Sequence, residues 1–192
     1  MEKRRLFIAT LLSEDTLDAI FKEIHPYLKH EALASARWVP KAQLHCTNLF
    51  LGSIKEENLM ELQTALKKVC ETLTSFELVF RTLEFGPTKR QPRLIWFKTD
   101  ESAEFLHMIR ALKHAVKPFL ETENTEHSPV AHITLARLRD FPREKVFKMH
   151  TPKPCHVLVE RIYLIESQFE PKGVVHIPLL ELPFLKSEAS NV

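Results

Sequence analysis

Hydrophobic and polar positions along the chain repeat with two different periods, which together predict both helices and strands. An apolar residue at every third or fourth position is typical of one helix face, whereas alternation or a short apolar run is typical of a strand. The first pattern predicts helices over about 14–28, 56–73 and 101–121, the first of them broken at Pro26. The second predicts strands near 4–11, 37–40, 43–51, 76–81, 94–97, 131–138, 157–165 and 174–182.

The predicted elements fall into two similar halves. A strand, a helix and a second strand follow one another in the first half, and the same order returns after residue 94. The strands outnumber the crossovers that a parallel sheet would require, so we expect an α+β fold with mostly antiparallel sheets. We assign residues 1–192 to a single domain, with a polar tail from about residue 186.

Composition narrows the class of protein without changing this picture. The apolar share of 44% and the charged share of 27% are those of an ordinary globular protein. With only three glycines, the chain has neither a G-x-x-x-x-G-K-[ST] nor a G-x-G-x-x-G sequence, which excludes the common nucleotide-binding loops. The net charge of +2 is too small to indicate nucleic-acid binding by itself.

Cysteine usage and the N-terminus both favour a cytoplasmic protein. The three cysteines, at positions 46, 70 and 155, are isolated, which is typical of a reducing compartment. A basic start at 3–5 precedes a short apolar run over 6–12, and no small-residue cleavage site follows it. We therefore interpret this run as a first strand and not as a signal peptide. No stretch of the sequence is long enough to span a membrane.

One short pattern occurs once in each half and carries the candidate chemistry. His45-x-Thr47 and His132-x-Thr134 both lie in apolar, strand-like segments. Residues i and i+2 of a strand point to the same side, so each histidine shares a face with its threonine. Two such strands would present two imidazoles and two hydroxyls to one ligand. Imidazoles that titrate near neutrality can accept and donate protons in turn, which suits phosphate chemistry without a metal.

Two simpler interpretations of the histidines compete with this one. Either histidine alone could be a half-buried strand residue that hydrogen-bonds to the backbone. A metal site could use His45, His132 and His127, but no carboxylate or cysteine has a matching short spacing. The matched contexts of the two motifs favour catalysis, and we expect neither a metal nor another cofactor.

The two motifs and their surroundings resemble the 2H phosphoesterases, in particular the LigT-like RNA 2′,3′-cyclic phosphodiesterases. The resemblance covers nearly the whole chain, and the segments that carry it are 5–9, 37–40, 44–52, 92–96, 131–137 and 163–167. It implies a bilobal fold in which two pseudo-symmetric lobes face a central cleft. Each lobe would contribute a mostly antiparallel sheet to the cleft and keep its helices on the outside.

The resemblance also implies a reaction and a role for each site residue. A ribose 2′,3′-cyclic phosphate would be opened to a 2′-phosphomonoester, and a related reversible 2′–5′ RNA ligation would be possible. His45 would be the proton donor and His132 the proton acceptor. Phosphate contacts would come from Thr47, Thr134 and Arg137, and the terminal base would stack on Phe50.

Some positions depart from the family pattern or from simple strand geometry. Cys46 and Asn48 stand where the family usually has apolar residues, and Ala131 replaces the proline that usually precedes the second histidine. Strict alternation would put Phe50 and Arg137, each five residues after its histidine, on the face opposite to it. These two residues reach the ligand only if the strand ends or twists before them.

The leading hypothesis is therefore a metal-independent cyclic phosphodiesterase, expected to be a monomer. Its partner would be RNA with a 2′,3′-cyclic phosphate end, such as a tRNA fragment. One alternative substrate is a 2′–5′ linked oligonucleotide or a small cyclic nucleotide, and another possibility is a non-catalytic RNA-end-binding module. A basic set of residues could hold the RNA backbone or simply be solvated surface; it comprises Lys89, Arg90, Arg93, Arg139, Arg143, Lys145 and Lys148.

Overall fold

The computed structural model describes residues 2–88, 90–121, 130–139, 141–171 and 173–185. Its three α-helices are α1 (Glu14–Ile24), α2 (Leu59–Cys70) and α3 (Ala103–Val116). Its strands are β1 (Lys3–Leu11), β2 (Arg37–Trp38), β3 (His45–Lys55), β4 (Phe76–Gly86), β5 (Leu94–Thr99), β6 (His132–Arg137), β7 (Cys155–Val159), β8 (Arg161–Glu170) and β9 (Gly173–Pro183). The α+β class and the antiparallel pairing expected from the sequence are both present.

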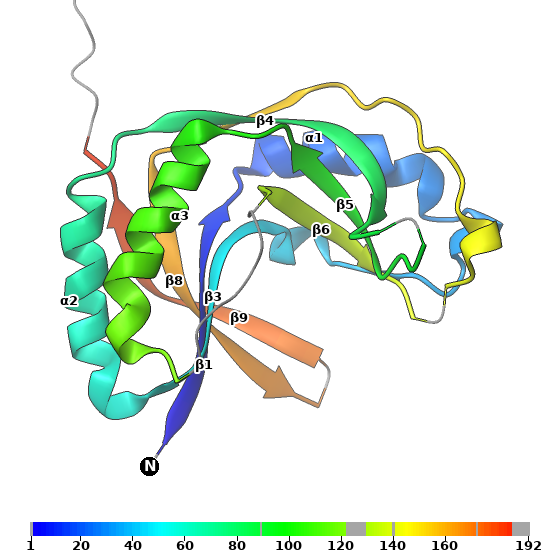
Figure 1. Ribbon diagram of the computed structural model, residues 1–192. Coiled ribbons are helices and arrows are strands. Elements are labelled where there is room, and N and C mark those ends of the chain that lie inside the picture. Colours follow the sequence, from blue (N-terminus) through cyan, green and yellow to red (C-terminus); the bar gives the residue numbers. More distant parts are fainter. Residues whose placement is uncertain (1, 89, 122–129, 140, 172, 186–192) are drawn as a thin grey trace, which may run out of the picture.

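These nine strands belong to one curled sheet, in the order β7-β4-β5-β6-β3-β1-β8-β9, with β2 paired to β6 (Figure 1). The expectation of two separate sheets facing a cleft is therefore wrong in this respect. The halves join where β3 pairs with β6, and the register there is the single pair Cys46 and Ile133. Because the join is so narrow, the sheet can curl about it. The two halves of this one curled sheet form the two sides of a concave surface, where two separate sheets had been expected.

The three helices pack on the face of the sheet opposite to the two motifs. Side chains of all three helices share one buried core with Cys46 and Ile133, the residues between each motif histidine and its threonine. Figure 1 shows α2 and α3 side by side next to β3 and β8, with α1 on the other side of the molecule behind β4 and β5. Alternation along β3 and β6 thus sends one set of side chains to the core and leaves the histidines on the open face.

Local sequence signals explain where the helices begin and end. Ser13 and Ser102 cap α1 and α3 by accepting hydrogen bonds from the backbone N–H groups of Thr16 and Phe105. Pro26 lies in the 3-10 turn that directly follows α1, as its missing N–H and fixed ring require. The first helix is therefore shorter than its apolar stripe suggested.

Several strand boundaries differ from the sequence prediction. Gly52 does not end β3, which continues to Lys55 with Gly52 at a φ of +72°, a conformation that favours glycine. The apolar run over 157–165 is two strands and not one, because the chain turns at Glu160 between β7 and β8. The predicted polar tail from residue 186 lies outside the described residues.

Within the part of the chain that the structure describes, no helix is long and apolar enough to cross a membrane. The three cysteines are free thiols buried in the core.

Candidate active site

The two motifs lie side by side at the centre of the sheet. Cys46 and Ile133 are direct partners in the antiparallel pairing of β3 with β6. This register puts His45 beside Thr134 and Thr47 beside His132, so the two motifs are related by an approximate two-fold axis through the Cys46–Ile133 pair. The histidines and threonines that sequence parity placed on one face of each strand are thus brought together on one surface.

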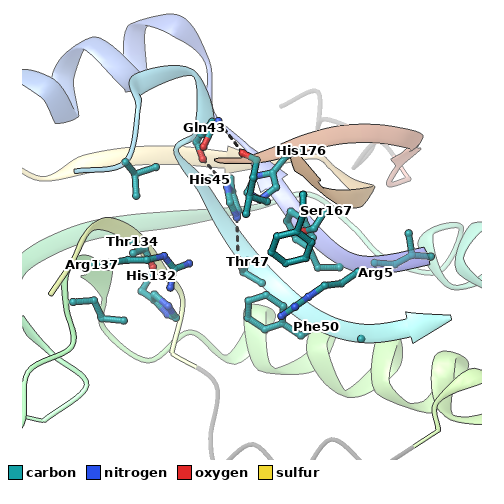
Figure 2. A pocket seen from close by; sticks show the side chains of 17 residues that line it. Arg5, Gln43, His45, Thr47, Phe50, His132, Thr134, Arg137, Ser167 and His176 are labelled. Atoms are coloured by element: carbon teal, nitrogen blue, oxygen red, sulfur yellow. Dashed lines mark hydrogen bonds between the residues drawn. The ribbon is translucent and has the colours of Figure 1, made fainter. Parts of the chain in front are cut away.

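A pocket of about 590 Å³ lies over this central pair. All six predicted site residues line it: His45, Thr47, Phe50, His132, Thr134 and Arg137. In Figure 2 the residues of β3 lie on one side of the pocket and those of β6 on the other. The remaining lining residues come mainly from β1, β8 and β9; those used below are Arg5, Phe7, Gln43, Ser167, Phe169 and His176.

A bulge in each motif strand explains how the fifth residue after each histidine reaches the pocket. In β3, Thr47 and Leu49 pair with consecutive residues of β1, so Asn48 is the extra residue. In β6, Thr134 and Ala136 pair with consecutive residues of β5, so Leu135 is the extra residue. Each bulge lies three positions after its histidine and reverses the alternation. Phe50 and Arg137 consequently face the pocket.

The ring of His45 is held at both nitrogens. Its Nδ1 donates to the carbonyl oxygen of Gln43 at 2.7 Å, which fixes the neutral tautomer with its lone pair on Nε2. The hydroxyl of Thr47 donates to that Nε2 at 3.1 Å. Gln43 is itself tied to β9, because its side-chain amide donates to the carbonyl of Val174 at 3.3 Å. The hydrogen bonds that join His45 to Gln43 and to Thr47 are drawn in Figure 2.

His132 is oriented in the same way from the other strand. Its Nδ1 donates to the carbonyl oxygen of Val130 at 2.9 Å, two residues before it, as Gln43 is two residues before His45. The neutral form therefore also keeps its lone pair on Nε2. Because each Nδ1 donates to the backbone carbonyl two residues earlier, the two neutral imidazoles have the same tautomer. Each Nε2 is then the atom that can accept a proton from a ligand or donate one to it.

Each motif histidine also packs against an aromatic ring from the strand next to its own, on the side away from the other motif. The ring centroid of Phe7 in β1 lies 5.2 Å from that of His45. Trp96 in β5 stands edge-on to His132 at 4.9 Å. Trp96 in turn needs Gly86 beside it, because a Cβ at that position would lie 2.4 Å from the indole ring. The paired supports restrict ring rotation on both sides of the site.

Burial and neighbouring cations make His45 difficult to protonate. Desolvation lowers the pKa of His45 from its ordinary value of 6.5 to about 4, and the nearby His176, Arg137 and His132 act in the same direction. The hydrogen bond to the Gln43 carbonyl opposes this shift without cancelling it. His45 is therefore neutral at pH 7.

His176 is a third imidazole in the pocket that the sequence did not reveal. It lies on β9, and its ring meets those of His45 and Phe7 at 5.1 Å and 5.0 Å in edge-on contacts. Burial and the charge of Arg137 lower its pKa. His176 belongs to no motif. It lies on the β8–β9 hairpin, and its position next to His45 depends on the long-range pairing of β8 with β1, which no local pattern encodes.

Arg5 and Phe169 are two further pocket residues to which the sequence assigned no role in the site. The guanidinium of Arg5 lies 5.6 Å from the centre of the Phe169 ring. Phe169 and Phe50 are both largely exposed although they are aromatic, at 70% and 50% of their surface. Exposed rings on the wall of a pocket are suited to stacking with planar ligands.

Among the residues described, no three or more His, Cys, Asp or Glu side chains come together in a way that could hold an ion. His127, the third histidine of the metal alternative, lies outside the described residues.

Comparison with solved structures identifies the class of fold. Crystal structures of Escherichia coli LigT resemble the chain with a TM-score of 0.77 at 20% identity for the complex with NADP+, over 95% of this chain and 99% of that one. A crystal structure of a protein from Thermus thermophilus has a TM-score of 0.75 at 28% identity, over 94% and 97% of the two chains. The class is thus the LigT-like α+β fold with its curled antiparallel sheet.

The chain belongs to the 2′-5′ RNA ligase superfamily, whose family model matches residues 14–168. Its relatives include the RNA 2′,3′-cyclic phosphodiesterase of Thermus thermophilus, which is 30% identical over 184 residues that span 91% of this chain and 87% of the relative. The RNA 2′,3′-cyclic phosphodiesterase of Thermotoga maritima is 24% identical over 182 residues, 94% and 95% of the two chains. The family resemblance expected from the motifs is confirmed.

Proposed function

We propose that this protein is an RNA 2′,3′-cyclic phosphodiesterase that opens the terminal cyclic phosphate by acid–base catalysis between His45 and His132. The observation that carries the proposal is the convergence of both histidines and both motif threonines on one pocket beside the Cys46–Ile133 pair. Family membership and the activity named for its relatives agree with it. The substrate would be RNA with a cyclic phosphate end, for example a tRNA fragment.

The proposed reaction is hydrolysis at phosphorus. His132 accepts a proton from water as the water oxygen bonds to phosphorus. The bond from phosphorus to the ribose 3′ oxygen breaks, and His45 gives a proton to that oxygen. The product carries a 2′-phosphomonoester and a free 3′ hydroxyl. A 5′ hydroxyl of a second RNA in place of water would form a 2′–5′ linkage, and reversal of that step exchanges the roles of the two histidines.

The phosphate oxygens would be held by Thr47, Thr134 and Arg137. Hydroxyl groups donate single hydrogen bonds, and the guanidinium can donate two to one phosphate. Among the described residues, Arg137 has no carboxylate partner that would neutralise it in advance. The cationic group can therefore offset the phosphate charge as it grows during attack.

The low pKa of His45 places a requirement on its role as proton donor. The neutral ring must take up a proton before it can give one. A bound phosphate anion would raise the pKa of His45, because its negative charge offsets the positive charge of Arg137 and favours the imidazolium. Substrate binding and protonation of His45 are then coupled.

The decisive experiment offers an RNA with a 2′,3′-cyclic phosphate end in the presence of EDTA and identifies the product. We expect a 2′-phosphate end. His45→Ala and His132→Ala should each reduce kcat by roughly 10²- to 10⁴-fold, the usual contribution of one acid or base. Full activity in either variant would exclude the two-histidine mechanism. Loss of wild-type activity in EDTA would instead support a metal site.

A binding-only role makes a different prediction in the same experiment. The protein would then retain affinity for the RNA end and show no turnover of any cyclic-phosphate substrate.

The buried free thiols of Cys46, Cys70 and Cys155 agree with action in the cytoplasm, where such groups stay reduced.

A further inference from the structure

A second, strongly basic pocket lies at the end of the strands that form the active site. It encloses about 500 Å³ and is lined by Arg90, Gln91, Pro92, Arg93, Leu138, Arg139 and Phe141. Its three apolar members, Pro92, Leu138 and Phe141, are buried, whereas the three arginines are exposed. The basic pocket, as we call it, thus has an apolar floor and a rim that carries three guanidinium groups.

The three arginines of the basic pocket are not neutralised by the part of the protein that the structure describes. Among those residues, none of the three makes an ion pair, whereas Arg4, Arg81 and Arg161 elsewhere each contact a carboxylate. Cations gathered without an acid repel one another, and an anion bound between them relieves that repulsion. Guanidinium groups also match phosphate geometry, since each can donate two parallel hydrogen bonds.

The basic pocket is a direct continuation of the active site. Leu94 of β5 and Arg137 of β6 are paired, and both line the active-site pocket. The next residue along each strand, Arg93 and Leu138, lines the basic pocket, and the N–H of Leu138 donates to the carbonyl of Arg93 at 2.7 Å. A polymer that leaves the active site along β6 therefore arrives at the basic pocket.

The separation of the two pockets indicates what the second one binds. Arg139 is five residues beyond Thr134 and two residues beyond the end of β6, so the two lie at most roughly 17 Å apart along the chain, the length of five fully extended residues. A mononucleotide held at the histidines has no second group that far away. A strand of RNA has a phosphate at every nucleotide, so phosphates upstream of the reacting end are available to the arginines.

We propose that Arg90, Arg93 and Arg139 form a second phosphate-binding site that holds the RNA backbone upstream of the cyclic end. The proposal rests on the proposed function for its reacting end, and it adds the substrate class. The protein selects oligonucleotides over mononucleotide cyclic phosphates, because only an oligonucleotide occupies both pockets at once. The arginines contribute to binding and not to the chemical step.

The test compares two substrates with one set of variants. The substrates are a 2′,3′-cyclic mononucleotide and an RNA of about ten nucleotides with the same 2′,3′-cyclic end, a length typical of single-strand sites. The variant carries Arg90→Gln, Arg93→Gln and Arg139→Gln together. The matched control removes the same charge from exposed positions on α2 and α3 through Lys67→Gln, Lys68→Gln and Arg110→Gln.

For the oligonucleotide we expect the pocket variant to lower kcat/KM by roughly 10- to 100-fold, through a higher KM. The slope of log(kcat/KM) against the logarithm of the salt concentration should become shallower by about two, the effect of losing about two phosphate contacts. For the mononucleotide we expect no change beyond about twofold, and the control variant should behave like the wild type on both. An equal loss on both substrates, or none on the oligonucleotide, would overturn the second site. A single Arg139→Gln variant keeps the test valid should the triple variant fold poorly.

A binding measurement separates failure of this inference from failure of the proposed function. Fluorescence anisotropy reports the affinity for a labelled RNA that ends in a 2′-phosphate, with no turnover required. Absence of turnover on both substrates would contradict the proposed function alone. Weaker RNA binding in the pocket variant would still support the second site, and unchanged binding would exclude it.

Discussion

The side chains of Thr10 and Asn48 hydrogen-bond to each other in the core directly beneath the first motif. The Asn48 amide donates to the Thr10 hydroxyl at 3.1 Å, and that hydroxyl lies 3.3 Å from the Asn48 carbonyl oxygen. Both residues are almost completely buried, with 5% exposure for Asn48 and 3% for Thr10. Asn48 is also the extra residue of the β3 bulge, so this polar pair holds the point at which the strand reverses its alternation.

We expect each half of this polar pair to depend on the other for stability. Asn48→Leu leaves the buried Thr10 hydroxyl without its partner, and Thr10→Val does the same to the Asn48 amide, so each should lower the free energy of unfolding by about 1–3 kcal/mol. The double variant should lose less than the sum of the two. Denaturant unfolding of the four proteins measures this coupling. Strictly additive losses would show that the two side chains do not support each other.

Strand parity sets the limit of what the sequence predicts for the site. His45, Thr47, His132 and Thr134 follow from the alternation of one strand each, because no other part of the chain is needed to choose their face. Phe50 and Arg137 lie beyond the bulges at Asn48 and Leu135, and a bulge is a property of two paired strands. Their direction therefore came from the family resemblance and not from local periodicity.

The same distinction applies to the fold. Helix positions were predictable because caps such as Ser13 and Ser102 and the apolar stripes are local. The single sheet was not, because the residues paired where its halves join, Cys46 and Ile133, are 133 − 46 = 87 positions apart. His176 reaches His45 through the equally non-local pairing of β1 with β8, because β9, the hairpin partner of β8, carries His176.

Phe50 should contribute to binding and not to the chemical step. It is half exposed and lines the pocket beside Phe7, whose ring centre is 6.1 Å away. Loss of a stacked base costs about 1–3 kcal/mol, so Phe50→Ala should raise KM by roughly 5- to 100-fold with kcat nearly unchanged. Phe50→Tyr keeps the ring and should restore KM. Steady-state kinetics on an RNA substrate decide this, and a loss confined to kcat would contradict the stacking role.

The stability of the protein should fall in mild acid because of His45. Its folded-state pKa of about 4 lies below the ordinary 6.5, so between these values the unfolded chain binds a proton that the folded chain does not. The contribution of His45 is therefore complete above pH 6.5 and is lost as the pH falls towards 4, by roughly 3 kcal/mol. Denaturant unfolding across this range tests it. The His45→Gln variant should show a correspondingly flatter profile, and an equally steep one would refute the assignment.

Bound phosphate should reverse the shift of His45. An anion near Arg137 favours the imidazolium, so the pKa of His45 should rise when a 2′-phosphorylated nucleotide fills the pocket. NMR titration of the histidine ring, with and without the nucleotide, measures this directly. Chloride at the same ionic strength is the control for general screening. An unchanged pKa would mean that substrate binding does not prepare His45 as a proton donor.

His176 should help to lower the pKa of His45. Its ring lies edge-on to His45, and the positive charge that His176 takes up in acid is the first of the neighbouring charges that lower the pKa of His45. His176→Asn removes that charge and admits water beside the ring, and both effects should raise the pKa of His45 in the same NMR titration. Ser167→Ala, which changes another lining residue without removing a charge, serves as the control. If His176→Asn and Ser167→Ala leave the same pKa for His45, then burial alone determines its protonation state.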